Sequence, residues 1–214
     1  MALKRYTIFY FICKTIIIIF SKIYWRLSAK GRENIPKEGG VLLVANHASY
    51  LDPPLIGSYS TRPVNILTKS ELFKIPIFNL IIKALGAIPI RREMIDRKSL
   101  RTAVDLLKDG CVLLVFPEGT RTRNGSIGNP KPGSGLIAKM ADVAIVPVYI
   151  QGSYETLPRR RIFPKPNKIK IHFGKSFTIS DSGYDVKEKD FVYKLSNFMI
   201  DKIKELKEKI NKEQ

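Results

Sequence analysis

The stretch "ANHASYLD", residues 45–52, holds the two residues of this chain best suited to acid–base chemistry. His47 is one of two histidines among 214 residues, and Asp52 follows five positions later. In a turn, the Asp52 carboxylate can accept a hydrogen bond from one imidazole nitrogen and leave the other nitrogen free as a base. A surface histidine beside a helix-capping aspartate would have the same spacing, so the spacing alone leaves both interpretations open.

The residues before His47 predict a buried strand that ends just ahead of it. Residues 40–45, "GVLLVA", form a continuous apolar run that is typical of a strand covered on both faces. Such a strand brings His47 to the carboxyl edge of a sheet, where α/β proteins place their ligands. The second histidine, His172, alternates with Lys168 and Lys170 on the polar side of another predicted strand, and we assign it no catalytic role.

Two further loops carry charged residues beyond predicted strands. In "FPEGTR", residues 116–121, Glu118 can orient a hydroxyl, Gly119 permits a tight turn, and Arg121 is a bidentate phosphate donor. "GAIPIRR" ends in Arg91 and Arg92. The simpler explanation for these arginines is that they are solvated side chains in a basic protein, although this explanation is less satisfactory for two such loops at once.

Short β-rich runs alternate with helical periodicity along the chain, which predicts one α/β domain with a largely parallel central sheet flanked by helices. The predicted strands are residues 40–45, 63–68, 87–90, 111–116, 144–150 and 168–173. The predicted helices are residues 76–85, 97–109, 134–141 and 187–210.

The first thirty residues predict an amphipathic helix with a very wide apolar face. Lys14 and Lys22 interrupt the apolar sequence, so no run approaches the roughly 20 residues of a spanning helix. On a helical projection the polar side holds Lys4, Thr7, Lys14, Thr15, Ser21 and Lys22, and the apolar side holds Phe9, Ile12, Ile16, Ile17, Phe20, Ile23 and Tyr24. We therefore expect residues 1–30 to lie in a membrane interface, with packing on the protein's own core as the alternative.

The charge of the chain indicates anionic partners. Lys and Arg number 37 against 19 Asp and Glu, a formal charge of +18, which attracts nucleic acid, phosphorylated metabolites or anionic lipid. We find no zinc-finger spacing, RNP-like strand or recognition helix, so we expect no nucleic-acid partner. Cys13 and Cys111 lack metal-ligand spacing, and we expect no metal site.

Four blocks in order resemble the glycerolipid acyltransferase family that includes 1-acyl-glycerol-3-phosphate acyltransferase. "NHASYLD" resembles its HxxxxD block, and "GAIPIRR", "FPEGTR" and "IVPVYI" resemble the second, third and fourth blocks. The resemblance covers about residues 30–155 and makes residues 31–214 an acyltransferase domain. Four ordered blocks are a specific signal, whereas HxxxxD alone is not.

The resemblance implies a role for each site residue. His47 takes a proton from the acceptor hydroxyl and Asp52 orients it, so that the acceptor oxygen attacks an acyl thioester directly. Arg91, Glu118, Gly119 and Arg121 bind the glycerol phosphate of the acceptor. Pro147 helps to shape the acyl pocket, and Lys131, in the Gly- and Pro-rich segment after "FPEGTR", is expected near the phosphate.

The implied reaction moves a fatty acyl group to lysophosphatidic acid and gives phosphatidic acid for phospholipid biosynthesis. The donor is acyl-ACP or acyl-CoA as co-substrate, with no further cofactor, and the expected location is the cytoplasmic face of the cell membrane, peripheral or monotopic. Glycerol 3-phosphate, another lysolipid or an aminoacyl lipid are alternative acceptors. A basic nucleic-acid-binding protein and a catalytically silent membrane-surface adaptor are the alternatives from other classes.

Overall fold

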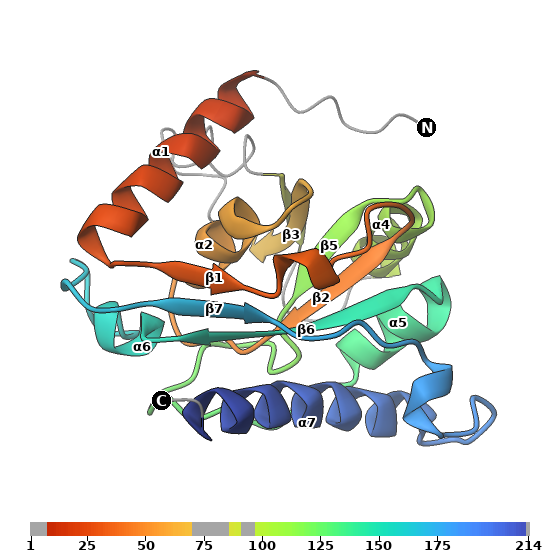
Figure 1. Cartoon of the computed structure of the whole chain (residues 1–214). Helices are drawn as coiled ribbons and strands as arrows, with labels where there is room; N and C mark the ends of the chain where they lie inside the picture. The colour runs from red at the N-terminus through yellow and green to blue at the C-terminus, as the bar shows by residue number, and fades with distance from the viewer. Residues whose placement is uncertain (1–7, 70–85, 91–96, 213–214) are drawn as a thin grey trace.

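The computed structural model describes residues 8–69, 86–90 and 97–212, and its described strands form one seven-stranded sheet (Figure 1). The strand order is β1-β7-β6-β2-β5-β3-β4. The strands are β1 (Ser28–Lys30), β2 (Val41–Ala45), β3 (Val64–Lys69), β4 (Ala87–Ile90), β5 (Val112–Val115), β6 (Ala144–Gln151) and β7 (Lys170–Phe173). The α-helices are α1 (Ile8–Tyr24), α2 (Asp52–Tyr59), α4 (Arg97–Lys108), α5 (Gly133–Ala141), α6 (Ser153–Thr156) and α7 (Phe191–Lys212), with 3-10 helices η1 (Arg32–Asn34) and η3 (Ser180–Ser182).

The sheet is largely parallel, as the sequence predicts, and each predicted strand corresponds to an observed one. Only β6 and β7 pair antiparallel among the described strands. Three of the predicted helices correspond to α4, α5 and α7, while the helix predicted at 76–85 lies outside the described residues. The short elements β1, α2 and α6 were not predicted.

Helices cover both faces of the sheet, which explains the continuous apolar sequence of its central strand. All five residues of β2 are buried, and they alternate between two core clusters according to the strand pleat. Leu42 and Val44 pack in the cluster formed with α4, α5 and α7, and Leu43 packs in the cluster that includes residues of α2. In Figure 1, α7 lies on one side of the sheet and α1 and α2 lie on the other.

The register of the central strands brings two predicted site loops together. β2 and β5 are parallel, with Val44 opposite Val115. His47 and Glu118 each follow these paired residues by three positions, so both side chains emerge at the same carboxyl edge of the sheet. The sheet therefore supplies the site with residues that are far apart in sequence.

Helix α1 ends at Tyr24, before the end of the predicted segment, and it packs on the protein through Tyr10, Lys14, Ile17, Ile18 and Ser21. Lys14 Nζ donates a hydrogen bond to the Ser60 carbonyl (2.9 Å), and Ser21 Oγ lies in hydrogen-bond contact with the Tyr59 hydroxyl (3.0 Å). Burial, with a smaller contribution from the charge of Arg32, lowers the pKa of Lys14 below its ordinary value. The exposed large apolar side chains of α1 are Ile8, Phe9, Phe11, Ile12, Ile16, Ile19, Phe20, Ile23 and Tyr24. Apart from Ile17, the apolar side of α1 therefore faces outward.

No helix within residues 8–69, 86–90 and 97–212 combines the length and the apolar character needed to cross a membrane.

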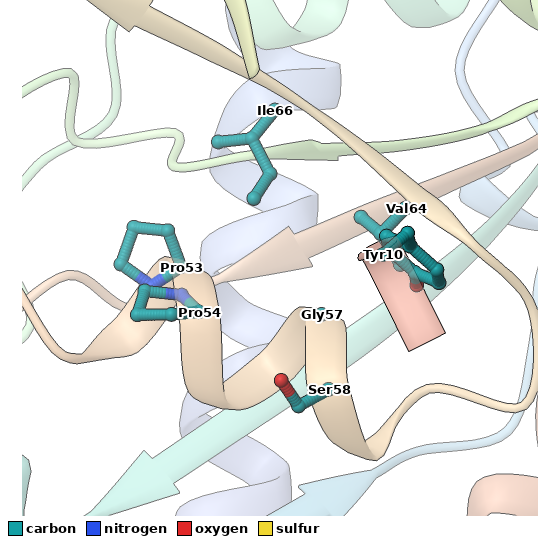
Figure 2. Close-up of a pocket in the computed structure, with 7 residues that line it drawn as sticks. All are labelled: Tyr10, Pro53, Pro54, Gly57, Ser58, Val64 and Ile66. Carbon is teal, nitrogen blue, oxygen red and sulfur yellow. The ribbon is translucent and has the colours of Figure 1, made fainter. Parts of the chain in front are cut away.

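A small cavity lies where Tyr10 of α1 meets α2 and β3 (Figure 2). Pro53, Pro54, Gly57 and Ser58 line it from α2. Its volume of about 10 Å³ admits about one water molecule, so this cavity is too small for an acyl chain.

Candidate active site

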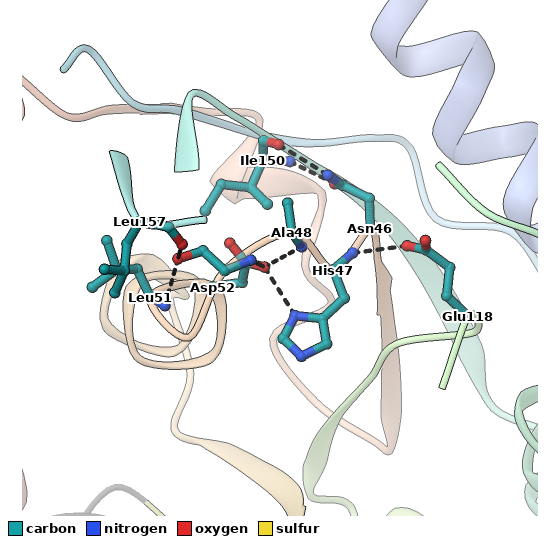
Figure 3. Close-up of polar contacts among 9 residues, drawn as sticks. Asn46, His47, Ala48, Leu51, Asp52, Glu118, Ile150 and Leu157 are labelled. Carbon is teal, nitrogen blue, oxygen red and sulfur yellow. Dashed lines mark hydrogen bonds and ion pairs between the residues drawn. The ribbon is translucent and has the colours of Figure 1, made fainter. Parts of the chain in front are cut away.

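His47 and Asp52 form a hydrogen-bonded pair at the carboxyl edge of the sheet (Figure 3). His47 Nδ1 lies 2.9 Å from Asp52 Oδ2. The imidazole is 12% exposed and the carboxylate is fully buried. Because Nδ1 is engaged by the carboxylate, Nε2 is the ring nitrogen left for proton transfer.

The Asp52 carboxylate is fixed by the loop that it closes. Besides His47, Oδ2 accepts hydrogen bonds from the backbone N–H groups of Ala48 (2.6 Å) and Ser49 (2.7 Å). Asp52 is the first residue of α2, where the helix dipole favours a negative charge. The local fold thus holds the carboxylate against the imidazole without a neighbouring cationic side chain in these contacts.

The backbone of His47 is held by the loop after β5. Its N–H donates to Glu118 Oε1 (2.8 Å), and its carbonyl accepts a hydrogen bond from the Thr122 N–H (2.8 Å). The ring also stacks on Phe116, with centroids 4.0 Å apart and planes inclined by 18°. His47 is therefore constrained at its N–H, its carbonyl, its Nδ1 and one ring face.

Glu118 uses both carboxylate oxygens on backbone amides. Oε1 accepts from His47, and Oε2 accepts from the Gly128 N–H (2.8 Å), which connects the segment after "FPEGTR" to the loop that carries His47. Glu118 is only 5% exposed. Burial raises the pKa of this carboxyl above its ordinary value, and the two backbone hydrogen bonds oppose that rise.

Asn46 and Ser49 attach the histidine loop to the neighbouring strand and helix. The Asn46 side chain donates to the Ile150 carbonyl (3.0 Å) and accepts from the Ile150 N–H (2.9 Å), as a backbone partner in the sheet would. Ser49 Oγ donates to the Leu157 carbonyl (2.9 Å). These hydrogen bonds therefore hold the loop in place beyond the end of β2.

Cationic side chains flank the pair on the loop after β5. The guanidinium carbon of Arg121 lies 3.4 Å from the centroid of the Tyr50 ring, an arrangement that a cation–π attraction favours. Gly119 has φ +66°, which L side chains rarely adopt, and a Cβ there would come within 2.9 Å of Lys131 Cδ. The glycine thus lets the exposed Lys131 side chain lie across the turn.

The remaining predicted residues have different placements. Arg91 lies outside the described residues. Pro147 is buried in the middle of β6, opposite Val44 of β2, and its carbonyl accepts a hydrogen bond from the Gly174 N–H (2.8 Å). The structure thus brings His47, Asp52, Glu118, Gly119 and Arg121 together, whereas Pro147 contributes to the sheet.

Sequence reasoning missed Tyr50, Phe116 and Thr122, which the structure places around the pair. Tyr50 and Phe116 both lie within the quoted motifs. Tyr50 lies between His47 and Asp52, and Phe116 lies two residues before Glu118, so their positions could have indicated that both rings lie near the site. Thr122 contacts His47 only through backbone atoms, and side-chain identity carries no such signal.

A largely parallel α/β sheet with a His–Asp pair and a flanking arginine at one edge defines the class of the protein, and sequence comparison agrees. The chain belongs to the Acyltransferase family, whose family model matches residues 26–151. This range contains the histidine loop, the loop after β5 and all of β6.

Several relatives and a solved structure are similar to this chain. A 1-acyl-sn-glycerol-3-phosphate acyltransferase of Bacillus subtilis is 26% identical over 204 residues, covering 94% of this chain and 98% of that protein. A chloroplastic 1-acyl-sn-glycerol-3-phosphate acyltransferase of Arabidopsis thaliana is 30% identical over 154 residues, covering 70% of this chain and 42% of that protein. The chain thus spans about half the length of several curated relatives that it matches.

The crystal structure of the 1-acyl-sn-glycerophosphate (LPA) acyltransferase PlsC from Thermotoga maritima superposes with a TM-score of 0.73 at 30% sequence identity. It covers 91% of this chain and 79% of that chain. The likeness therefore extends through most of the fold and is not limited to the motifs.

Proposed function

We propose that this protein is a 1-acylglycerol-3-phosphate O-acyltransferase that converts lysophosphatidic acid into phosphatidic acid. The acyl donor is a thioester, either acyl-ACP or acyl-CoA. The observation that carries the proposal is the imidazole of His47, which the Asp52 carboxylate orients. Arg121 lies beside it in the chain fold, because the next residue, Thr122, donates a backbone hydrogen bond to the His47 carbonyl. A base and an anion-binding group thus share one edge of the sheet.

In the proposed reaction, Nε2 of His47 takes the proton of the acceptor hydroxyl as its oxygen attacks the thioester carbonyl. A C–O bond forms, and the tetrahedral intermediate collapses with cleavage of the C–S bond. The imidazolium then returns its proton to the departing thiolate. Asp52 holds the tautomer and stabilises the imidazolium, and the thioester is reactive enough that no metal or cofactor takes part.

The acceptor phosphate is bound in this proposal by Arg121, with Lys131 and Arg91 as further cations. Guanidinium groups suit phosphate because they donate two parallel hydrogen bonds. Both oxygens of Glu118 already accept backbone N–H groups, so its contacts favour a positioning role for His47 and Gly128 over a direct contact with the acceptor.

The outward apolar face of α1 supports a membrane location for the enzyme. Its exposed Ile and Phe side chains, from Ile8 to Ile23, would lie in the interfacial region of a bilayer, where the lysolipid acceptor resides. The +18 charge favours an anionic cytoplasmic leaflet. We therefore propose a peripheral or monotopic enzyme on the cytoplasmic face of the cell membrane.

The decisive experiment is thiol release from palmitoyl-CoA and from an acyl carrier protein thioester in detergent micelles, with and without lysophosphatidic acid. Release that requires the acceptor, yields phosphatidic acid and disappears in His47→Ala is the expected result. Glycerol 3-phosphate and other lysophospholipids serve as comparison acceptors. Activity with one of these and none with lysophosphatidic acid would refute the proposed acceptor.

A further inference from the structure

The loop between α6 and β7, residues 157–169, presents two apolar side chains to solvent. Ile162 is 83% exposed and Phe163 is 78% exposed. Moving neighbouring apolar side chains this exposed from water into an apolar environment lowers their free energy. The α6–β7 loop therefore carries an apolar tip without a covering element among the described residues.

Basic residues surround this tip. Arg159, Arg160 and Arg161 precede it directly, Lys165 and Lys168 follow it, and all five are exposed. Between Glu155 and Asp181 the sequence contains no acidic residue. The tip therefore projects from a wholly cationic stretch, which favours an anionic partner with an apolar interior.

The α6–β7 loop is fastened to the carboxyl end of α1. The Tyr24 hydroxyl donates to the Pro164 carbonyl (3.4 Å), and Trp25 Nε1 donates to the Lys165 carbonyl (3.2 Å). Trp25 also packs edge-on against Phe20, with ring centroids 5.2 Å apart. In Figure 1 the loop lies beside the carboxyl end of α1, so the apolar tip and α1 are neighbouring parts of the structure.

We propose that the α6–β7 loop is a second membrane contact, in which Ile162 and Phe163 enter the headgroup region of an anionic bilayer and Arg159, Arg160 and Arg161 bind lipid phosphates. This inference rests on the proposed membrane location of α1. In this proposal the α6–β7 loop helps to set the orientation of the enzyme on the bilayer, although Lys165 in the loop and its partner Trp25 are 140 residues apart in sequence.

An acidic soluble protein, such as an acyl carrier protein, is the competing partner for a cationic loop. The bilayer is favoured because charge complementarity alone does not account for the exposed Ile162 and Phe163, and because the loop is bonded to the carboxyl end of α1, whose apolar side chains are also exposed. A polybasic segment beside an apolar anchor combines the two signals that give stable binding to an anionic leaflet.

The test is flotation of the full chain with vesicles of phosphatidylcholine alone or of equal parts phosphatidylcholine and phosphatidylglycerol. Arg159→Gln/Arg160→Gln/Arg161→Gln should lower partitioning into the anionic vesicles on the order of 10²-fold and leave partitioning into neutral vesicles nearly unchanged. Ile162→Ser/Phe163→Ser should lower both on the order of tenfold or more.

Matched controls lie on α7, which covers the face of the sheet opposite α1. Lys204→Gln/Lys209→Gln/Lys212→Gln removes the same charge and should change anionic partitioning less than about threefold, because α7 lies across the sheet from the membrane-facing side of α1. Tyr193→Ser removes an exposed aromatic ring (53% exposed) and should change neither partitioning. Turnover in detergent micelles shows whether each variant is folded.

The outcomes separate this inference from the proposed function. Wild type that does not float overturns the membrane location itself. Wild type that floats, with both loop variants floating equally well, overturns the second contact and leaves the role of α1 intact. Loop variants that float normally but show a raised KM for the acyl carrier protein thioester in micelles would make the loop a protein-docking surface and overturn the proposal.

Discussion

The two sides of the candidate site are built differently. On the proton-transfer side, His47 is held at its backbone N–H, its carbonyl, its Nδ1 and one ring face. On the anion side, Arg121 stacks on a Tyr50 ring that is 56% exposed, and Lys131 is exposed. Proton transfer depends steeply on geometry, whereas binding a doubly charged phosphate tolerates small displacements, so the fold concentrates its rigid contacts where position matters more.

Loss of the base should have the largest effect on the rigid side. We expect His47→Ala to lower kcat/KM about 10³-fold, with the fold retained, because no other described group can replace Nε2. The steady-state rate of thiol release measures this effect. His172→Ala is the matched control and should keep normal activity, and equal losses in both variants would remove the distinction between the two histidines.

Loss of the Asp52 charge tests the role of the carboxylate on the proton-transfer side. Asp52→Asn keeps an oxygen for the Ala48 and Ser49 amides but removes the negative charge that stabilises the imidazolium, so kcat should fall about 10²-fold or more. Pre-steady-state rates of acyl transfer report this directly. An unchanged kcat would mean that Asp52 only shapes the loop.

Glu118 distinguishes positioning from acceptor binding. In Glu118→Gln one amide oxygen can satisfy either the His47 or the Gly128 N–H, but the NH₂ group cannot accept the other. We expect kcat to fall about 10- to 10²-fold with the acceptor KM nearly unchanged. A raised KM at constant kcat would instead place Glu118 on the acceptor.

The anion side should respond through KM. We expect Arg121→Ala to raise the acceptor KM about tenfold or more, because a charged hydrogen bond to phosphate is lost. Tyr50→Ala should raise it about two- to fivefold, and Tyr50→Phe, which keeps the ring, should restore it. If Tyr50→Phe behaves like Tyr50→Ala, the hydroxyl and not the stacking matters.

The smallest effect concerns stability against pH. The raised pKa of Glu118 means that the folded state holds this proton more tightly than the unfolded state. The contribution of Glu118 to the free energy of unfolding is therefore greatest below the ordinary glutamate pKa and declines as pH rises through the raised value. Urea titrations of wild type and Glu118→Gln across this range should show a difference that shrinks with pH, and a constant difference would contradict the assignment.

Most of the sheet and the members of the site could be predicted because each strand is a local apolar run and each site residue directly follows one. The meeting of His47 with Glu118 depends on register, with Val44 opposite Val115, and register is not encoded in either motif alone. The Arg121 and Tyr50 stack likewise joins two loops that only the folded sheet brings together. Three-residue β1 is too short to show a period.

Helix α1 shows a second limit of sequence patterns. Periodicity separates its polar and apolar sides but does not say which side faces the protein. Lys14 and Ser21 face inward because the Ser60 carbonyl and the Tyr59 hydroxyl lie opposite them, and neither partner is visible from the helix sequence. In α7, by contrast, Phe191, Leu195 and Met199 are buried in the core, as its apolar stripe predicts.

The pairing of β1 with β7 has a consequence for biosynthesis. Ser28 pairs with Lys170, so the strand that follows α1 finds its partner only after most of the chain has left the ribosome. At about 5–20 residues per second, that interval lasts on the order of ten seconds. During that time the apolar side chains of α1 have been synthesised, but the edge strand that follows α1 has no partner yet. With the membrane location proposed above, this order of synthesis would favour binding of α1 to the bilayer before the sheet is complete.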